Sequence, residues 1–340
     1  MKKLRVIQFG IMHEHAVGKL ITLKKMPDVY ELVGVVDDRN TTSPTPIDPS
    51  YLDRDFADVP RFTVEQALAM NDIDVAFVET PNLELVPMAM KCAEHNLHLH
   101  VDKPAGESLE DYRRLLDLCR EKGLAFQMGY MFRGNPTLNF VRELVKKNVL
   151  GNVYEVLMDM NHGYGGEPYQ AYIGAFRGGI MFNLGCHLID YIVSLFGEPQ
   201  KVVPLLGTAA GDADAVKNNC MAILEYPHTH VMLQSCSRQD DVTSISRRTL
   251  LVNGSNGWAE LQPLERFDGK EQVLEVFLKN ATPDYPAGRH TFKFPPRQDR
   301  YIEQLAELAA IVRGEMANPY TFEHDYIVHK VTLQASGYIE

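Results

Sequence analysis

The sequence has no excess of basic charge. Its 340 residues include 34 lysines and arginines against 45 aspartates and glutamates, a formal net charge of −11 at pH 7. A protein that binds nucleic acid or an anionic membrane surface needs a basic field to neutralise phosphate groups. The charge balance therefore argues against both kinds of partner, and we expect a small molecule as the ligand.

Long hydrophobic runs are also missing, and cysteine is scarce. No apolar stretch approaches the roughly 20 residues of a membrane span. The apolar run Val6-Ile7 behind the basic N-terminus stops at Gln8, which is too short for the core of a signal peptide. The five cysteines are odd in number and contain no CxxC pair. Free thiols are typical of a reducing compartment, so we expect a cytoplasmic protein that does not span a membrane.

Length and apolar content predict two folded domains. Hydrophobic residues make up 45% of the chain, enough for a buried core, and roughly 150 residues per domain gives about two domains. Residues 1–128 alternate apolar strands with helical patterns, which is typical of a doubly wound parallel sheet, the Rossmann fold. The expected strands are 4–9, 31–36, 73–78, 97–101 and 124–128, and the expected helices are 15–26, 64–70, 83–95 and 109–122.

The pattern changes after Gly129, and we expect residues 129–340 to form a second α/β domain. Its strands follow one another with turns between them, which is typical of one large open, mainly antiparallel sheet. The second domain's expected strands are 221–226, 230–236, 248–252 and 273–278, and its expected helices are 136–149, 179–196, 299–312 and 323–336.

In the first domain, residues 40–60 are rich in proline and are expected to form an irregular surface segment.

The turn after the first strand is the candidate dinucleotide site. Gly10 stands at the first glycine position of a Gly-x-Gly-x-x-Gly pattern, whereas Met12 and His15 occupy the other two glycine positions. By itself this turn is also compatible with an ordinary strand–helix connection. Its place in the fold favours a dinucleotide, because Asp37 at the end of the second strand can bind an adenosine ribose and repel a 2′-phosphate. We therefore expect NAD, with NADP possible.

Two histidines flank Glu14 in the same turn and raise the question of a metal site. A metal site needs three or more converging ligands, and His13 and His15, as alternating residues of one turn, supply two. We therefore expect no metal here. We interpret the two side chains as a polar rim beside the phosphates of the cofactor.

The order and spacing of several motifs resemble one known family. Gly10 and Asp37 are followed by Thr80-Pro81-Asn82, Asp102-Lys103-Pro104, Tyr130 and Arg133, and Gly178-Gly179 ahead of Asn183, Gly185, His187 and Asp190. This series resembles the glucose–fructose oxidoreductase, inositol dehydrogenase and rhizopine catabolism family (Gfo/Idh/MocA) over nearly the whole chain. The resemblance implies a Rossmann domain followed by an open-sheet domain. It also implies an NAD(P)-dependent oxidoreductase that acts on a hydroxyl of a sugar, cyclitol or related polyol, assembled into homodimers or homotetramers through the open sheet.

The candidate catalytic residues are Lys103, His187 and Asn183. Lys103 follows a strand end, where ligands of open α/β sheets collect. Asn183 and His187 are four residues apart and share one helix face, with Asp190 on nearly the same stripe. The resemblance implies that His187 is the general base, with Asn183 in place of the aspartate that orients it, and that Lys103 lies near the nicotinamide and the substrate hydroxyl.

The amide at position 183 leaves several chemistries open. Losing a carboxylate in such a role can cost about 10⁴ in rate. Either Asp190 or another carboxylate substitutes, or Lys103 is the base, or the reaction is not a plain dehydrogenation. The alternatives to a dehydrogenase are a redox-neutral sugar-modifying enzyme that uses tightly bound NAD transiently, and a non-catalytic sensor that binds a dinucleotide.

The remaining candidate residues surround these groups. The expected cofactor-binding residues are Gly10, Met12, His13, Asp37, Thr80, Pro81, Asn82, Asp102 and Lys103. The expected substrate-binding residues are Tyr130, Arg133, His162, Tyr164, Tyr172, Arg177 and His187. Those between 162 and 177, together with Tyr169, are interpreted as a lid over the substrate, or else as a polar loop with scattered aromatic side chains.

Overall fold

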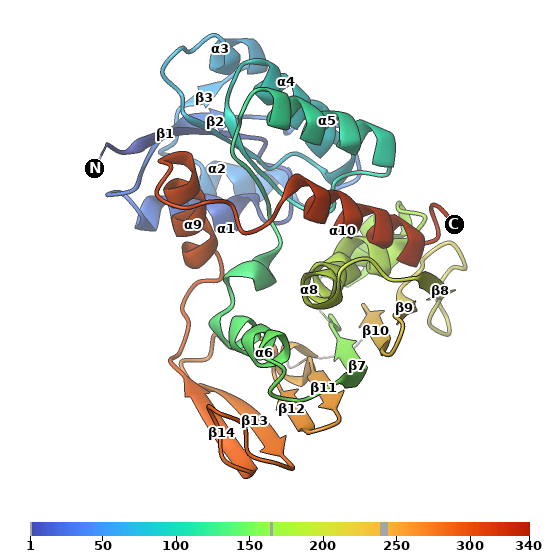
Figure 1. The fold of residues 1–340 in the computed structure, drawn as a ribbon. Coiled ribbons are helices and arrows are strands. Elements are labelled where there is room, and N and C mark those ends of the chain that lie inside the picture. Colours follow the sequence, from blue (N-terminus) through green and yellow to red (C-terminus); the bar gives the residue numbers. More distant parts are fainter. Residues whose placement is uncertain (1, 164–165, 239–243) are drawn as a thin grey trace. The chain divides into compact units, whose positions relative to one another are not determined.

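The computed structural model of the chain describes residues 2–163, 166–238 and 244–340 (Figure 1). The described chain divides into two compact units. The first unit comprises the chain up to Tyr130 together with Tyr301–His329, and the second comprises Met131–Arg300 together with Lys330–Glu340. Each unit is built around its own β-sheet.

Within the described residues, the first unit holds a six-stranded parallel sheet with the order β3-β2-β1-β4-β5-β6. This is the doubly wound order, and the expected Rossmann fold is therefore confirmed. The chain turns outward from β1 to β2 on one side and from β4 to β5 on the other, so the switch point lies between β1 and β4. The strands are β1 (Leu4–Phe9), β2 (Tyr30–Val36), β3 (Arg61–Phe62), β4 (Val75–Val78), β5 (His98–Val101) and β6 (Phe126–Met128).

Helices connect these parallel strands. Helix α1 packs against β2, and α4 packs against β4 and β5, so apolar strands such as β4 are buried along their whole length. Side-chain caps fix several helix starts: Thr63 forms a capping box with Gln66 at α3, and Ser108 caps α5. The helices are α1 (Ala16–Lys25), α2 (Leu52–Asp55), α3 (Val64–Leu68), α4 (Leu85–Glu94) and α5 (Leu109–Glu121). The short helix α2 lies within the stretch expected to be irregular.

The C-terminal part of the chain divides between the two units. Helix α9 (Ile302–Val312) and the start of α10 (Phe322–Ala335) belong to the first unit, although the expected second domain included residues 301–329. The Tyr30 hydroxyl donates to the carbonyl of Leu305 over 2.6 Å. These contacts between segments far apart in sequence are invisible to local patterns. The functional division into a cofactor domain and a substrate domain stays a prediction.

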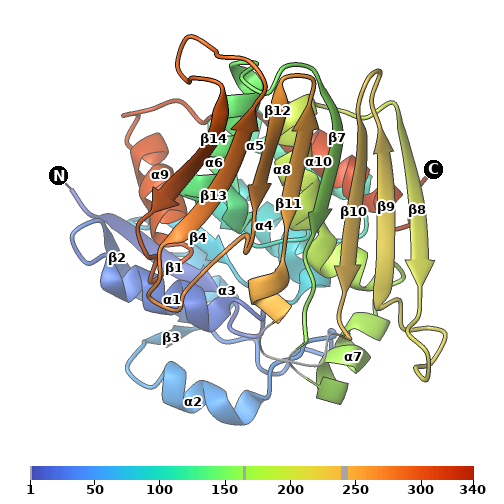
Figure 2. The ribbon, with the colours of Figure 1, turned by 90° about the horizontal axis from the view of Figure 1, so that it is seen from below.

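The second unit holds an eight-stranded sheet, counted over the described residues, with the order β14-β13-β12-β11-β7-β10-β9-β8 (Figure 2). Neighbouring strands are antiparallel except for the parallel pair β10 and β7, which confirms the expected large, mainly antiparallel sheet. The strands are β7 (Val153–Asp159), β8 (Lys201–Gly207), β9 (Asn219–Glu225), β10 (His230–Cys236), β11 (Leu250–Gly254), β12 (Gly257–Leu261), β13 (Gln272–Leu278) and β14 (Gly288–Phe294).

The helices of the second unit include α6 (Pro136–Lys146), α7 (Gly166–Gly174) and α8 (Cys186–Phe196). The single helix expected over 179–196 is instead a π-helical turn, Met181–Gly185, that leads into α8. A side chain at position 185 would contact the sulfur of Met181, which would then have to move. π-helical turns are frequent at functional sites.

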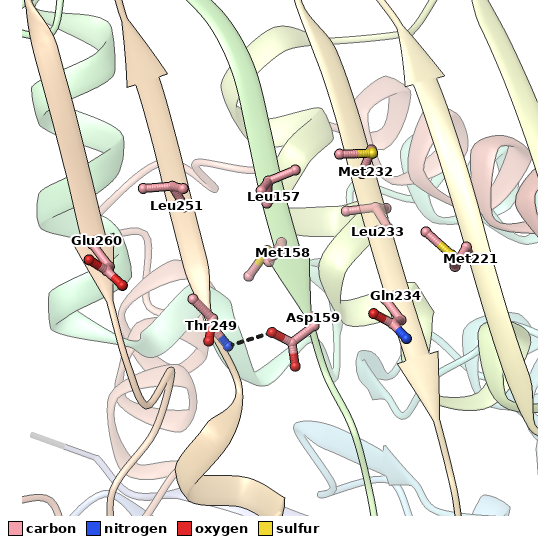
Figure 3. Close-up of a pocket in the computed structure, with 10 residues that line it drawn as sticks. All are labelled: Leu157, Met158, Asp159, Met221, Met232, Leu233, Gln234, Thr249, Leu251 and Glu260. Carbon is pink, nitrogen blue, oxygen red and sulfur yellow. Dashed lines mark hydrogen bonds between the residues drawn. The ribbon is translucent and has the colours of Figure 1, made fainter.

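One face of the second unit's sheet carries a row of apolar side chains across five strands. Val203 pairs with Ile223, Ile223 with Met232, Met232 with Leu157, and Leu157 with Leu251. We call these five residues the apolar row. Figure 3 shows Met232, Leu157 and Leu251 lining a shallow hollow of this face. The opposite side chains, such as Val231 and Leu233, are fully buried.

Candidate functional site

The candidate cofactor site lies at the carboxyl ends of β1, β4 and β5, next to the switch point of the parallel sheet. Gly10 follows β1 with a φ of +101°. A Cβ atom at this position would lie 2.5 Å from the backbone nitrogen of Thr80 and 2.6 Å from the carbonyl carbon of Glu79. Only glycine fits between the two strand ends, as the sequence pattern predicted for a dinucleotide turn.

Of the two acidic residues after β2, Asp38 faces this turn. Its Oδ1 atom accepts hydrogen bonds from the backbone nitrogens of Ile11, at 2.7 Å, and Met12, at 3.1 Å. Burial raises the pKa of Asp38 to about 6, although these backbone donors oppose the shift. The sequence pattern points to Asp37 instead of Asp38, because the two aspartates differ by one position at the strand end.

The predicted ribose-binding residue, Asp37, is paired with two arginines. Its carboxylate lies 2.9 Å from the Nη2 atom of Arg39 and also binds Arg61. The same two arginines bind Asp53. The charge of Asp37 is therefore balanced by two cations, which weakens the expected repulsion of a 2′-phosphate at this position.

Lys103 follows β5 and its side chain is fully buried. Its Nζ atom donates to the Oε1 atom of Glu14 over 3.0 Å. Burial alone would raise the pKa of Glu14, but the charges of Lys103, His15 and His13 outweigh it and lower the pKa to about 2. Glu14 is therefore ionised at neutral pH and fixes the position of the Lys103 ammonium group.

The two histidines of the turn adjoin Asp102. His15 lies with its Nδ1 atom 3.1 Å from Oδ1 of Asp102. The backbone nitrogen of His15 donates to Nδ1 of His13 over 3.2 Å, and burial lowers the pKa of His13 to about 4. Although burial opposes it, the interactions of Asp102 with His15, His13 and Lys19 hold its pKa well below the usual range.

The loop after β4 brings a buried acid to the same place. Burial, followed by the like charge of Asp102, raises the pKa of Glu79 well above its ordinary value. Glu79 therefore holds a proton more tightly than an ordinary glutamate does, next to Asp102. The predicted cofactor residues Thr80, Pro81 and Asn82 follow directly and are buried. Sequence analysis did not identify Glu79, which stands between an apolar strand and this motif.

A second set of buried, hydrogen-bonded polar groups, from α1, β5 and β6, adjoins Asp102. Lys19 of α1 donates to the Nε2 atom of His100 in β5 over 2.5 Å, and its Nζ atom lies 3.8 Å from Oδ2 of Asp102. The Nδ1 atom of His100 lies 3.0 Å from the Oε1 atom of Gln127, which fixes the tautomer in which Nδ1 carries the proton. In the sequence, these hydrogen-bonded residues are visible only as polar residues within apolar segments.

In the second unit, Asn183 is held by two tyrosines of α7. Its Nδ2 atom donates to the hydroxyl of Tyr169 over 3.1 Å, and the hydroxyl of Tyr172 donates to its Oδ1 atom over 3.2 Å. The ring of His162 stacks on Tyr169, with centroids 4.5 Å apart. The structure thus brings together four of the predicted residues of this unit. Tyr164 lies outside the described residues.

The other predicted residues of the second unit lie around α8 and after α7. His187 is buried in α8, 5.7 Å from the ring of Phe132. Arg133, expected to bind substrate, donates through Nε and Nη2 to the carboxylate of Asp190, at 2.6 Å for the shortest bond. The negative charge of Asp190 is therefore balanced by a buried arginine. Arg177 is exposed, with its guanidinium 5.9 Å from the centroid of Tyr338.

Both parts of the chain match models of one protein family. Residues 9–130 match the model described as "Oxidoreductase family, NAD-binding Rossmann fold". Residues 138–260 match the model described as "GFO/IDH/MocA C-terminal domain". The expected NAD-binding domain is therefore confirmed. In the described residues, no helix combines the length and apolarity needed to cross a membrane.

The chain is similar to curated proteins over part of their length. It is 28% identical over 207 residues to the oxidoreductase YdgJ of Escherichia coli K12, which covers 59% of this chain and 58% of that protein. It is 26% identical over 140 residues to the 2,7-anhydro-N-acetylneuraminate hydratase of the same organism, covering 40% of this chain and 37% of the hydratase. The matches thus span little more than half of these proteins at most.

A solved structure shows the same fold over nearly the whole chain. The 3-ketoreductase KijD10 of Actinomadura kijaniata, solved with TDP-benzene and NADP, superposes with a TM-score of 0.75. The superposition covers 98% of this chain and 96% of that protein, at 16% sequence identity. At this identity the similarity concerns the fold.

Proposed function

Since the chain belongs to the GFO/IDH/MocA family of NAD(P)-binding oxidoreductases, we propose that it oxidises a hydroxyl group of a sugar, cyclitol or related polyol. Lys103 is the observation that carries the proposal. It is buried at a strand end next to the Gly10 turn, with its ammonium group held by Glu14 at 3.0 Å. A solvated surface lysine would not need this arrangement.

The residues around Gly10 fit a dinucleotide. Because Gly10 has no Cβ atom, the backbone of Glu79 and Thr80 at the end of β4 lies close to the turn. His15, at the start of α1, forms no side-chain cap to that helix. The backbone nitrogen of Ala16 donates to the carbonyl of His13 at 3.1 Å, so a pyrophosphate would be bound by the N–H groups that follow it in the first turn. Asp38 is the carboxylate that we assign to the adenosine ribose, because it already lies against the turn. Thr80 supplies a buried hydroxyl for which the described residues offer no hydrogen-bond partner.

Lys103 and His187 are the residues that we assign to the proton chemistry. A bound nicotinamide supplies the acceptor for the hydride from the substrate carbon. The Nζ atom of Lys103 donates to the substrate oxygen and stabilises the alkoxide as it forms. The imidazole of His187 takes the hydroxyl proton as general base. Asn183 holds the tyrosines of α7 in place and gives the site its shape.

The test is turnover by the full-length protein with NAD⁺ or NADP⁺ and a panel of polyols and sugars. We expect absorbance of the reduced nicotinamide to appear with at least one of them. Lys103→Met should lower kcat at least a hundredfold, the low end of what general acid–base catalysis contributes, while dinucleotide affinity stays within a few-fold. Lys270→Met, at an exposed turn of the second unit, should behave as wild type. An unchanged kcat for Lys103→Met would return this lysine to a structural role.

A redox-neutral reaction is the second candidate, and the similarity to a hydratase favours it. In this case a sugar would be changed by elimination, hydration or hydrolysis without net formation of reduced cofactor. The same panel separates the two functions when the sugar products are followed together with the nicotinamide absorbance. Product without reduced cofactor would support this candidate, and binding of cofactor without any product would support a sensor.

A further inference from the structure

Three strand ends of the first unit bring four potential metal ligands together. His13 and His15 follow β1, Glu79 follows β4 and Asp102 follows β5. We call these four residues the histidine–carboxylate cluster. One ligand atom each from His13, His15 and Asp102 lies within 4.8 Å of the others. Sequence analysis counted only the two histidines of the turn, because the carboxylates lie more than 60 residues further along the chain.

The distances within the cluster are those of groups that face a common point. The Nδ1 atom of His13 lies 3.7 Å from Oε2 of Glu79 and 3.8 Å from Oδ2 of Asp102. On the other side of Asp102, Oδ1 lies 3.1 Å from Nδ1 of His15. Ligands of one small ion lie about 3.3 Å apart when each is about 2.0–2.1 Å from the metal. To reach this geometry, the side chains would rotate, and the Nδ1 atom of His13 would give up the hydrogen bond that it accepts from the backbone nitrogen of His15.

One member of the cluster carries a buried polar atom without an ordinary partner. The side chains of His13 and Glu79 are 0% exposed. Among the described residues, none forms a hydrogen bond with the Nε2 atom of His13, whereas the carboxyl group of Glu79 forms a side-chain hydrogen bond with Asp102. Buried polar groups are normally satisfied. A metal ion bound to the imidazole of His13 would account for the unpartnered atom.

Groups of both signs of charge surround the cluster. Asp102 and Glu79 belong to it and Glu14 adjoins it, and the ammonium groups of Lys19 and Lys103 lie beside these three acids. Lys103 is bound to Glu14 at 3.0 Å, and Lys19 donates to His100 at 2.5 Å. Each lysine therefore has a polar partner outside the cluster.

We propose that the histidine–carboxylate cluster binds one divalent transition-metal ion, such as Zn²⁺, with His13, His15 and Asp102 as ligands and Glu79 as the fourth. Two imidazoles and two carboxylates are donors that suit this class of ion. The ion joins the ends of β1, β4 and β5. It also gives a reason for histidine, rather than glycine, at position 15 of the turn. The proposal goes beyond the oxidoreductase function and does not depend on it.

The first test uses the unmodified full-length protein without any dinucleotide. After treatment with a chelator and dialysis, titration with Zn²⁺ and with Co²⁺ should show one equivalent bound and a rise in the thermal unfolding temperature. X-ray absorption of the zinc-loaded protein should show imidazole nitrogen and carboxylate oxygen around the metal. Absence of stoichiometric binding would overturn the proposal, and so would a shell of sulfur or of oxygen alone.

The second test uses variants. His13→Gln and His15→Gln should each weaken Zn²⁺ binding at least tenfold and remove the thermal shift. His228→Gln is the matched control, because His228 is an exposed histidine of the second unit and should bind as wild type does. Binding equally strong in all three variants would place the metal elsewhere and refute the assignment. Circular dichroism of each variant verifies that it is folded. If a variant is not folded, the X-ray absorption spectrum of the zinc-loaded wild-type protein decides whether histidine and carboxylate side chains bind the metal.

Discussion

At the scale of single residues, the site depends on which of two neighbouring carboxylates meets the cofactor. Asp38 binds the amides of the Gly10 turn, whereas Asp37 is occupied by Arg39 and Arg61. From the strand pattern alone, the last residue of a strand is known only to within a position or two. This shift by one residue changes the predicted coenzyme preference, since the charge of Asp37 is balanced.

We predict that Asp38→Asn weakens NAD binding about tenfold or more, because the amide accepts fewer hydrogen bonds from a ribose. Asp37→Asn is the matched control and should change NAD affinity less than threefold. Calorimetric titration of both variants with NAD and NADP measures this. A larger loss for Asp37→Asn than for Asp38→Asn would restore the assignment made from the sequence.

We predict that Asn183→Asp lowers both stability and activity. The amide donates to Tyr169 and accepts from Tyr172, and a carboxylate cannot donate. It would also place a charge at a fully buried position, which costs about 1–3 kcal/mol when a hydrogen-bond partner is lost. Denaturant unfolding at pH 7 and kcat/KM across the range of histidine titration are the measurements. Tyr169→Phe removes the same hydrogen bond without adding charge, and should cost less. A tenfold gain in kcat/KM for Asn183→Asp would instead indicate an ordinary dehydrogenase with a weakened catalytic pair.

At the scale of elements, the sequence patterns predict the longer strands of the first unit and their ends, but they miss β3 and, in the second sheet, β7, β8, β12 and β14. Apolar runs bounded by turns mark β1, β2, β4 and β5, and the chemistry follows directly from the ends of these strands. The patterns fail where a partner is distant in sequence. Arg133 is paired with Asp190, 57 residues away, and Tyr30 donates to the carbonyl of Leu305, 275 residues away.

Helix α10 carries a buried histidine that makes the first unit sensitive to acid. His329 packs edge-on against Tyr112, with ring centroids 4.7 Å apart, and burial lowers its pKa from 6.5 to about 3. The unfolded chain therefore binds a proton between these pH values that the folded chain does not. The contribution of the buried, neutral His329 to the free energy of unfolding is complete above pH 6.5 and is lost as the pH falls toward 3.

We predict that His329→Leu flattens the acid side of the stability profile. Relative to wild type, its free energy of unfolding should improve by up to about 1.4 kcal/mol per pH unit between pH 6 and pH 4. Denaturant unfolding at several pH values measures the slope. The exposed His228→Leu should keep the wild-type slope, and a His329→Leu profile parallel to wild type would contradict the assigned cause.

At the scale of the whole molecule, the sheet of the second unit carries the apolar row on a face that also holds polar side chains such as Glu260 and Gln234. We expect a second copy of the chain to cover this row. The apolar row crosses five strands, and Met232 at its centre is 37% exposed. Leu205, 49% exposed, lies on the same face. Side chains of this kind in one continuous row are typical of protein–protein interfaces. We therefore keep the prediction of homodimers or homotetramers through this sheet.

We predict that Met232→Glu shifts the protein toward monomers, because two copies of the row would then bury facing carboxylates. Light scattering coupled to size-exclusion chromatography measures the mass. Met316→Glu, at a similarly exposed methionine of the first unit, is the control and should leave the mass unchanged. A monomeric wild-type protein at micromolar concentration would disprove the assembly.

The division of the first unit between two distant segments has a consequence for how the protein is made. Residues 301–329 supply α9 and the beginning of α10 to this unit. The hydroxyl of Tyr30 reaches its partner at Leu305 across 275 positions of the chain. During synthesis on the ribosome, these contacts form only after almost all of the polypeptide has emerged. The cofactor-binding unit, although its first 130 residues are translated first, is therefore completed only after all strands of the second unit's sheet have been translated.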